Sequence, residues 1–176
     1  MPHFDIRALS LEPHTVEQLA EMLVEVVAHG GSVSFMHPLS PETAREFWRR
    51  SLAAAAAGER VVLGALLEGV VVSTVTLHLD CPPNQPHRGE IAKMMTRVAC
   101  RGRGCAGALL AEAERRAADR GRTLLTLDTA EEDGAARLYE KQGYVFAGMI
   151  PDYAFKPHGG LTGTRIYFKR LGAAAG

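Results

Sequence analysis

The sequence predicts an α/β or α+β fold with a mixed β-sheet. The first observation is the order of the predicted elements along the chain, β-α-α-β-β-β-α-β-α-β-β. Hairpin-like neighbours in this order indicate antiparallel pairs, whereas strand–helix–strand units indicate parallel pairs. The second observation is that 176 residues with 47% hydrophobic content fit one domain with an ordinary core. We therefore expect a single domain over 1–171, followed by a short frayed tail at 172–176.

The first third of the chain predicts one strand and two helices. Residues 3–8 alternate between polar and apolar types, which is typical of a strand. Residues 15–29 carry apolar side chains at helical spacing, and a Thr-x-x-Gln capping box at Thr15 predicts where this helix begins. Residues 40–58 begin with a serine N-cap, a first-turn proline and a glutamate, and they predict the second helix.

A β-hairpin and a further strand follow. The β-rich runs at 60–67 and 70–79 are separated only by a Glu-Gly dipeptide at 68–69, and this spacing predicts a two-residue turn. Three prolines at 81–87 predict a loop. The run at 88–98 then predicts another strand.

The second half of the chain alternates helices and strands. Apolar positions spaced by three or four residues after Gly104 predict an amphipathic helix that Gly121 closes. Gly143 closes the next predicted helix in the same way. The remaining predicted elements are a strand at 123–129, a helix at 132–142 and strands at 144–150 and 164–171.

Charge and composition exclude several classes of protein. The 20 basic and 20 acidic residues cancel, so nucleic acid and anionic membrane surfaces are not expected partners. No run approaches the ~20 apolar residues that cross a bilayer, and residues 1–7 lack the pattern of a signal peptide. Three cysteines cannot form a complete disulfide framework and indicate a reducing, cytoplasmic setting. No histidine or cysteine cluster has ligand spacing, so no metal is expected.

The most informative segment is Arg101-Gly102-Arg103-Gly104-Cys105-Ala106, which lies between a predicted strand and a predicted helix. The start of a helix presents unpaired N–H groups and partial positive charge, and glycines let the backbone approach an anion closely. The segment therefore predicts a phosphate site. The P-loop pattern does not fit. Gly102, Gly104 and Gly107 keep a dinucleotide-binding interpretation open, because Asp128 ends the next strand at a suitable distance.

Two motifs, in the expected order, resemble those of the GNAT N-acetyltransferases. Arg101-x-x-Gly104-x-Ala106 is similar to the acetyl-CoA signature of that family, and residues 135–144 are similar to its Ala-x-x-Leu-Tyr-x-Lys-x-Gly-Phe/Tyr segment. A narrower likeness to the tabtoxin-resistance type of acetyltransferase includes Glu90-x-x-Lys93-Met94-Met95 and Leu127-Asp128-Thr129. The resemblance implies a mixed, mostly antiparallel sheet of six to seven strands flanked by about four helices.

The resemblance also implies an acyltransferase that uses acetyl-CoA as its cosubstrate. Such an enzyme would move an acetyl group directly from the thioester to a primary amine of a small molecule, for example an antimetabolite or toxin similar to tabtoxinine-β-lactam. Acetylation of a protein N-terminus or another amine remains an alternative, as does a non-catalytic coenzyme A-binding module. An exposed edge strand would support a homodimer.

The same resemblance assigns roles to particular residues. Tyr139 is the expected hydrogen-bond donor to the leaving sulfur, although full proton transfer from a phenol (pKa ~10) to a thiolate (thiol pKa ~8.5) would be uphill by about 2 kcal/mol. Glu90 and Asp128 are the candidate bases for the proton of the amine, with Glu90 slightly ahead. Both carboxylates, together with Phe35 and Met36, are the expected contacts of the acceptor. The expected contacts of acetyl-CoA are Met95, Thr96, Arg97, Val98, Arg101, Gly102, Arg103, Gly104, Cys105, Ala106 and Tyr139.

Overall fold

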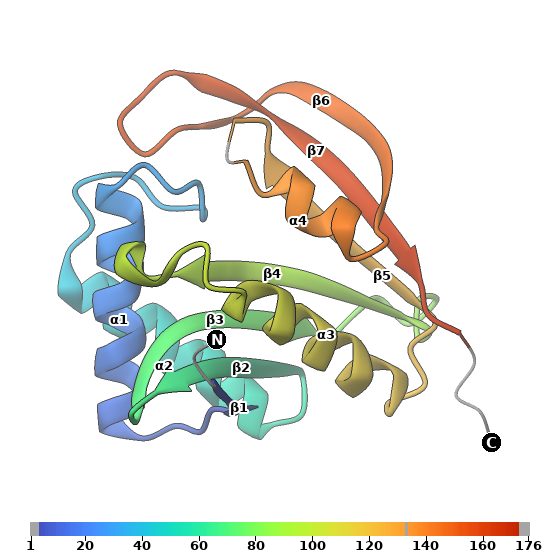
Figure 1. Ribbon diagram of the computed structural model, residues 1–176, viewed down its shortest axis with the longest axis horizontal. Coiled ribbons are helices and arrows are strands. Elements are labelled where there is room, and N and C mark those ends of the chain that lie inside the picture. Colours follow the sequence, from blue (N-terminus) through green and yellow to red (C-terminus); the bar gives the residue numbers. More distant parts are fainter. Residues whose placement is uncertain (1–3, 133, 173–176) are drawn as a thin grey trace.

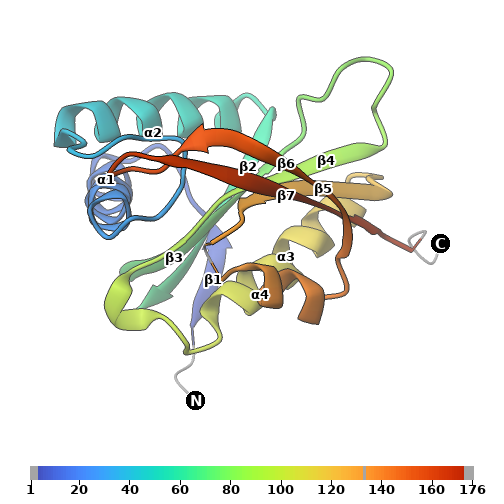
Figure 2. The same ribbon diagram turned by 90° about the horizontal axis from the view of Figure 1, so that it is seen from above.

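A seven-stranded sheet runs through the molecule, with two helices against each of its faces (Figure 1, Figure 2). The computed structural model describes residues 4–132 and 134–172, so His3, Asp133 and residues 173–176 of the predicted elements and tail lie outside the described residues. The elements are β1 (Asp5–Ala8), α1 (Pro13–Ala28), α2 (Pro41–Ala56), β2 (Arg60–Leu67), β3 (Val70–His78), β4 (Arg88–Thr96), the 3₁₀ turn η1 (Val98–Cys100), α3 (Cys105–Ala118), β5 (Leu124–Ala130), α4 (Ala136–Lys141), β6 (Val145–Phe155) and β7 (Leu161–Arg170). The predicted fold class is confirmed.

The sheet opens in its middle. Its strands follow the order β1-β2-β3-β4-β5-β7-β6, and every neighbouring pair is antiparallel except β4 with β5. The parallel pairing of β4 with β5 stops at Ile91 and Leu127. Both strands continue beyond this point but diverge (Figure 1). No described strand therefore pairs with the side of residues 92–96 that faces β5.

The β2–β3 hairpin forms as predicted. Glu68 and Gly69 connect the two strands with φ angles of 51° and 80°, so both turn residues are in the left-handed region. Such a turn twists in the same sense as the two strands that it joins. Glycine adopts this conformation without strain, and the glutamate is tolerated because the pairing on both sides of the turn fixes the register.

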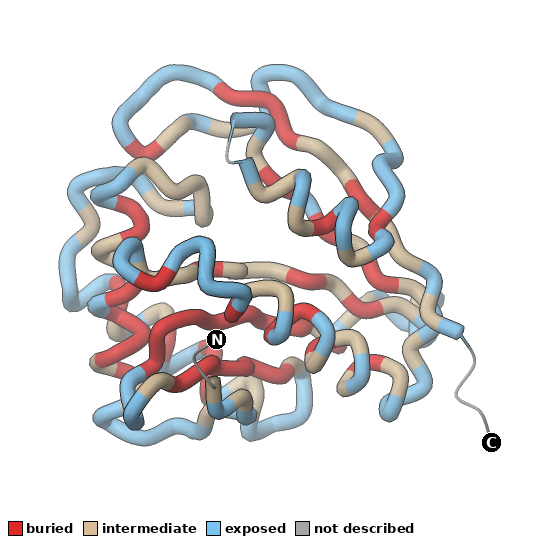
Figure 3. Tube along the Cα trace, viewed as in Figure 1, coloured by how far each residue is buried: buried red, intermediate tan, exposed pale blue. Residues whose placement is uncertain are grey.

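Each face of the sheet has its own hydrophobic core, because successive side chains of a strand point to opposite faces. In β2, Val61, Leu63 and Ala65 pack on the side of α3 and α4. Val62 and Leu66 pack on the side of α1 and α2. Figure 3 shows the buried positions concentrated in β2 and β3, whereas most of the edge strand β6 is exposed. This alternation fixes which face each helix covers.

The edge strand β6 carries several exposed apolar side chains. Val145, Phe146, Met149, Ile150 and Tyr153 are each between 45% and 55% exposed. An edge of this kind presents unpaired backbone groups to a neighbouring chain. The homodimer that such an edge would support stays a prediction.

The two predicted helix starts near the N-terminus have different outcomes. The capping box at Thr15 was wrong, because α1 already begins at Pro13 and its N-cap, Glu12, makes no side-chain capping bond. Proline suits the first helical position, where its missing N–H costs nothing. The predicted start of α2 is confirmed, because the Ser40 hydroxyl accepts a hydrogen bond from the Thr43 backbone N–H at 3.1 Å.

The C-terminal elements differ more from their predicted bounds. β4 ends at Thr96 and gives way to η1, and the helix predicted at 132–142 is reduced to α4. β6 continues through Pro151 to Phe155, far beyond its predicted end at residue 150. A register shift between Ile150 and Ala154 accommodates this continuation. Proline is tolerated there because β6 is an edge strand whose outer side needs no backbone donor.

Candidate active site

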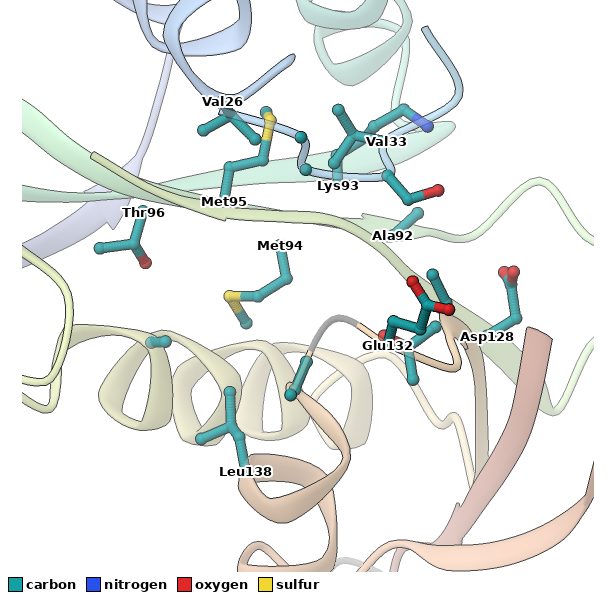
Figure 4. Close-up of a pocket in the computed structure, with 18 of the residues that line it drawn as sticks. Val26, Val33, Ala92, Lys93, Met94, Met95, Thr96, Asp128, Glu132 and Leu138 are labelled. Atoms are coloured by element: carbon teal, nitrogen blue, oxygen red, sulfur yellow. The ribbon is translucent and has the colours of Figure 1, made fainter. Parts of the chain in front are cut away.

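A cavity of about 950 Å³ lies where β4 and β5 diverge. Its walls come from the α1–α2 loop at 29–34, from β4 at 91–96, from the start of α3, from β5 and α4, and from β6 and β7. Figure 4 shows Thr96 towards one end of this cavity and Asp128 towards the other. The two ends differ in chemistry.

The Thr96 end of the cavity contains a glycine-rich helix start. Gly102 and Gly104 have φ angles of 74° and 86°, and Gly104 is the N-cap of α3 without a side-chain capping bond. A Cβ at either glycine would meet no protein atom within 4 Å, so open space borders this backbone. Arg101, Cys105 and Ala106 line the cavity beside them. Uncapped N–H groups next to a guanidinium attract an anion such as a diphosphate.

The backbone of β4 supplies a second set of donors. Residues 92–96 line the cavity on the side where no described strand pairs with them. Backbone N–H groups of an extended strand point alternately to its two sides, so those directed at β5 can bind a ligand. Met95 and Thr96 both line the cavity, and Met95 is also 2% exposed in the core beneath α1.

Three residues predicted to contact acetyl-CoA lie outside the cavity lining: Arg97, Val98 and Arg103. The Arg97 guanidinium bonds two backbone carbonyls of neighbouring elements and the carboxylates of Glu21 and Glu25. The Val98 N–H donates to Glu25 at 2.7 Å. Arg97 and Val98 therefore fasten the end of β4 to α1, and their predicted role as direct ligand contacts stays a prediction.

Tyr139 faces the cavity from α4. Its side chain is 4% exposed, and its ring lies 5.9 Å from the ring of Tyr144 and 6.1 Å from that of Tyr167. Gly107 of α3 comes close to α4, because a Cβ there would lie 3.1 Å from Nε2 of Gln142. The phenol ring is therefore packed against two other aromatic rings beside the contact of α3 with α4.

Asp128 lines the opposite end of the cavity, from β5. It lies one residue past Leu127, where pairing with β4 stops, and its side chain is exposed to solvent in the cavity. The Thr164 hydroxyl of β7 lies 3.0 Å from Oδ2 of Asp128, as a donor, and is shared with the Thr129 carbonyl at 3.2 Å. The carboxylate is thus oriented from the neighbouring strand but keeps free acceptor positions.

Glu90, the first choice for the base from sequence, is not part of the cavity lining. It lies opposite Thr126 within the paired part of β4 and β5. Nη1 of Arg88 lies 3.2 Å from the Glu90 carboxylate and 2.8 Å from the Thr126 hydroxyl. The parallel register therefore separates the two candidate carboxylates, leaving Glu90 engaged by an arginine and Asp128 at the opening.

Phe35 and Met36 also lie outside the cavity lining. The Phe35 ring packs edge-on against the Phe47 ring of α2 at 5.2 Å, and Met36 is 49% exposed. The part of this loop that lines the cavity is residues 29–34. The predicted contact of Phe35 and Met36 with the acceptor stays a prediction, and the neighbouring residues 29–34 are the ones that line the cavity.

Several lining residues carried no predicted role. Lys93 of β4 appears in a quoted motif, and its charge within the otherwise apolar run at 91–95 is a signal that could have singled it out. Tyr153, Phe155 and Lys156 line the cavity from the end of β6. They carried no signal in the sequence, because they follow a proline that predicts the end of a strand.

Two distant segments that both line the cavity, the α1–α2 loop and the β6–β7 hairpin, are joined to each other. The His37 N–H donates to the Pro157 carbonyl at 2.9 Å, and the rings of His37 and His158 lie 4.5 Å apart. Nε2 of His158 lies 3.0 Å from the Ala28 carbonyl. The α1–α2 loop is thereby joined to the β6–β7 hairpin.

Two findings concern the described residues as a whole. Over 4–132 and 134–172, no group of three or more histidine, cysteine, aspartate or glutamate side chains is arranged to hold a metal ion. Over the same ranges, no helix has the length and the apolar character that a bilayer crossing requires.

Similarity to known proteins decides the family. The acetyltransferase (GNAT) family profile matches residues 23–144. The chain belongs to this family. It is therefore an acetyl-CoA-dependent acyltransferase of the N-acetyltransferase type, and the glycine-rich start of α3 falls within the matched part. The dinucleotide-binding interpretation of the glycine spacing is set aside by this match.

Solved GNAT structures share the whole fold. An N-acetyltransferase from Staphylococcus aureus Mu50 gives a TM-score of 0.82 at 17% identity, covering 97% of this chain and 99% of that one. A ribosomal-protein-alanine N-acetyltransferase from Brucella melitensis gives a TM-score of 0.79 at 22% identity, covering 95% of this chain and 99% of that one. A phosphinothricin acetyltransferase from Sinorhizobium meliloti, solved with acetyl-CoA, gives a TM-score of 0.82 at 20% identity, covering 98% of this chain and 90% of that one. At these identities the similarity establishes the fold.

Proposed function

We propose that this GNAT enzyme acetylates the primary amine of a small molecule, such as an antimetabolite or toxin of amino-acid size. One observation carries the proposal: a single cavity joins the glycine-rich start of α3 to the carboxylate of Asp128. The first end suits the diphosphate of acetyl-CoA. The second end suits a cationic amine, because a carboxylate favours the ammonium form until the proton is removed.

The joined loop and hairpin favour a small acceptor over a protein N-terminus. The α1–α2 loop and the β6–β7 hairpin both line the cavity and are joined by the bond from His37 to Pro157 and by His158, so they bound the cavity on that side. A polypeptide would need an open groove along which its following residues could lie. The Brucella melitensis relative is named for a protein substrate and the Sinorhizobium meliloti relative for a small one. A cavity bounded by the joined loop and hairpin fits the second kind.

The proposed transfer has four steps, in which bonds and protons balance. The acceptor ammonium, whose pKa in water is ~10.4 for a simple alkylamine, loses one proton to Asp128, directly or through water. The freed amine nitrogen attacks the thioester carbonyl carbon, and a carbon–nitrogen bond forms. The carbon–sulfur bond breaks, and Tyr139 donates a hydrogen bond to the departing sulfur. The second nitrogen proton leaves to solvent as the amide forms, and the thiolate is released or takes up a proton.

In the proposed transfer, the backbone of β4 stabilises the charge that develops when the amine attacks. Negative charge develops on the carbonyl oxygen when the amine attacks. The unpaired N–H groups of residues 92–96 are fixed in place by the sheet, so they can stabilise this charge without reorganising. A donor of this kind is worth roughly 3–4 kcal/mol in well-studied enzymes. Asp128 is preferred as the base because it lines the cavity, whereas Glu90 is engaged by Arg88.

An assay of thiol release from acetyl-CoA tests the proposal. The panel contains small primary amines, including amino acids, and short peptides with free N-termini. We expect turnover with small amines and little with peptides. Turnover confined to peptides would replace the small-molecule acceptor by a protein one, and coenzyme A binding without any turnover would leave a non-catalytic module.

Two isosteric variants test the choice of base. Asp128→Asn should lower kcat by about 100-fold or more, and higher pH should partly restore activity as the amine loses its own proton. Glu90→Gln, the matched control at the neighbouring carboxylate, should lower kcat by less than about tenfold. A larger loss of kcat in Glu90→Gln than in Asp128→Asn would assign the role of the base to Glu90.

A further inference from the structure

Lys93 occupies an unusual place in β4. The pairing of β3 with β4 shifts register between Thr74 and Thr76, which leaves an extra residue in β4 at this point. Lys93 has a φ angle of 51°, in the region that side chains rarely adopt. Strained conformations of this kind persist where the surrounding structure holds them, often at ligand sites. Here the bulge lies at a lysine that lines the cavity.

The lysine is half-buried and lacks an anionic partner among the described side chains. Its Nζ donates to the Ser34 hydroxyl at 2.9 Å and lies 5.8 Å from the centre of the Phe47 ring. Burial lowers the pKa of Lys93, and the charges of Asp128 and Glu90 act in the opposite direction. A partly dehydrated cation that makes no direct ion pair gains from an incoming anion.

The second lysine of the cavity is in a different situation. Nζ of Lys156 lies 3.1 Å from the Glu132 carboxylate, so its charge is already paired within the chain. Both Lys93 and Lys156 line the same cavity as Asp128. In Figure 4, Lys93, Ala92 and Asp128 succeed one another towards this end of the cavity. The acceptor end thus combines an available carboxylate with an available ammonium group.

We infer that Lys93 determines acceptor specificity by pairing with an acidic group on the molecule whose amine reaches Asp128. The inference rests on the proposed function and names its substrate class: small zwitterions that carry an amine and a carboxylate or similar acid. Lysine is a compact point charge, so it accepts acids of several shapes, whereas an arginine would prefer a planar one. The carboxylate and the ammonium of the protein then face the opposite charges of one acceptor.

Matched acceptors provide the first test. Amino acids and their primary amides have nearly the same size but differ in the acidic group, and thiol release gives kcat and KM for each. We expect the wild type to show a KM at least tenfold lower for the acids. Lys93→Met should abolish this preference, Lys93→Arg should keep much of it, and the control Lys156→Met should retain it. Equal KM values in the wild type, or a preference that survives Lys93→Met, would overturn the inference.

A binding measurement gives a second test that needs no turnover. In the presence of coenzyme A, amino acids should raise the Tm of the wild type more than their amides do, and Lys93→Met should remove this difference. Equal shifts for acids and amides would again reject the role of Lys93. Failure of the proposed function and failure of this inference can be told apart. Absence of turnover with every small amine would reject the proposed function. Turnover with small amines but without a preference for acids would reject only the role of Lys93 in specificity.

Discussion

Glu25 of α1 accepts a hydrogen bond from the backbone N–H of Val98 at 2.7 Å. The same carboxylate contacts Arg97 at 3.3 Å, and its side chain is 27% exposed. Glu25 therefore helps to hold the turn that leads from β4 to the glycine-rich segment, together with the other partners of Arg97. Glu25 itself does not line the cavity.

We expect Glu25→Ala to lower the free energy of unfolding by about 1–2 kcal/mol, because Val98 loses a charged acceptor and Arg97 loses one of its partners. Urea denaturation measures this change. Glu21→Ala is the matched control, since Glu21 also contacts Arg97 at 3.3 Å but is 59% exposed, and it should cost less than about 1 kcal/mol. Equal losses for the two variants would show that the Val98 contact adds nothing.

Tyr139→Phe should lower kcat by about 100-fold while leaving the Kd of acetyl-CoA nearly unchanged, because the hydroxyl acts only as the carbon–sulfur bond breaks. Steady-state kinetics and calorimetry separate the two quantities. Tyr167→Phe is the control, since it removes a hydroxyl from the adjacent ring, which bonds Glu140 at 3.0 Å and does not line the cavity. Unchanged kcat in Tyr139→Phe would exclude a role for the phenol in the reaction.

Gly104→Ala should destabilise the protein by about 1–2 kcal/mol, because its φ of 86° is costly for a residue with a Cβ. It should also weaken acetyl-CoA binding at least tenfold, since relief of this strain turns the backbone N–H groups away from the cavity. Gly58→Ala has the same strain, with φ of 82° and an equally open surrounding, but lies outside the cavity lining. The unfolding free energy of Gly58→Ala should fall by the same amount, and its affinity for acetyl-CoA should stay unchanged. Equal affinities in the two variants would argue against a diphosphate at this turn.

Glu112 makes part of the stability dependent on pH. Hydrogen bonds from Arg115, and then from Arg116, lower its pKa from 4.5 to about 2. Because the folded-state pKa is depressed, the contribution is fully present above pH 4.5 and is lost as pH falls towards 2. With Arg115 57% exposed, solvent screening limits it to about 1 kcal/mol. Urea denaturation of wild type and Glu112→Gln should show a difference that shrinks over this range; a constant difference would contradict the assignment.

Local features of the fold were readable from the sequence. The β2–β3 turn and the start of α2 depend mainly on residues close in the sequence, such as Gly69 and Ser40, and both were predicted correctly. The glycine-rich segment before α3 was placed for the same reason. The end of β6 was missed, because Pro151 predicts a stop and only the pairing with β7 carries the strand past it.

The site was less accessible to prediction, because it depends on the register of distant strands. Glu90 and Asp128 look equivalent as acids on neighbouring strands. Only the pairing of β4 with β5, and its end at Ile91, places one outside and the other inside the cavity. Lys93 owes its position to a bulge that has no signature in the composition of the strand.

The joining of the α1–α2 loop to the β6–β7 hairpin has a consequence for the efficiency of the reaction. His158 contacts a carbonyl 130 positions away in the chain, so this wall of the cavity forms only when both of these distant segments are in place. A thioester bound within a walled cavity is better shielded from bulk water, which would otherwise hydrolyse it. The joined segments therefore limit the hydrolysis of acetyl-CoA that competes with acetyl transfer.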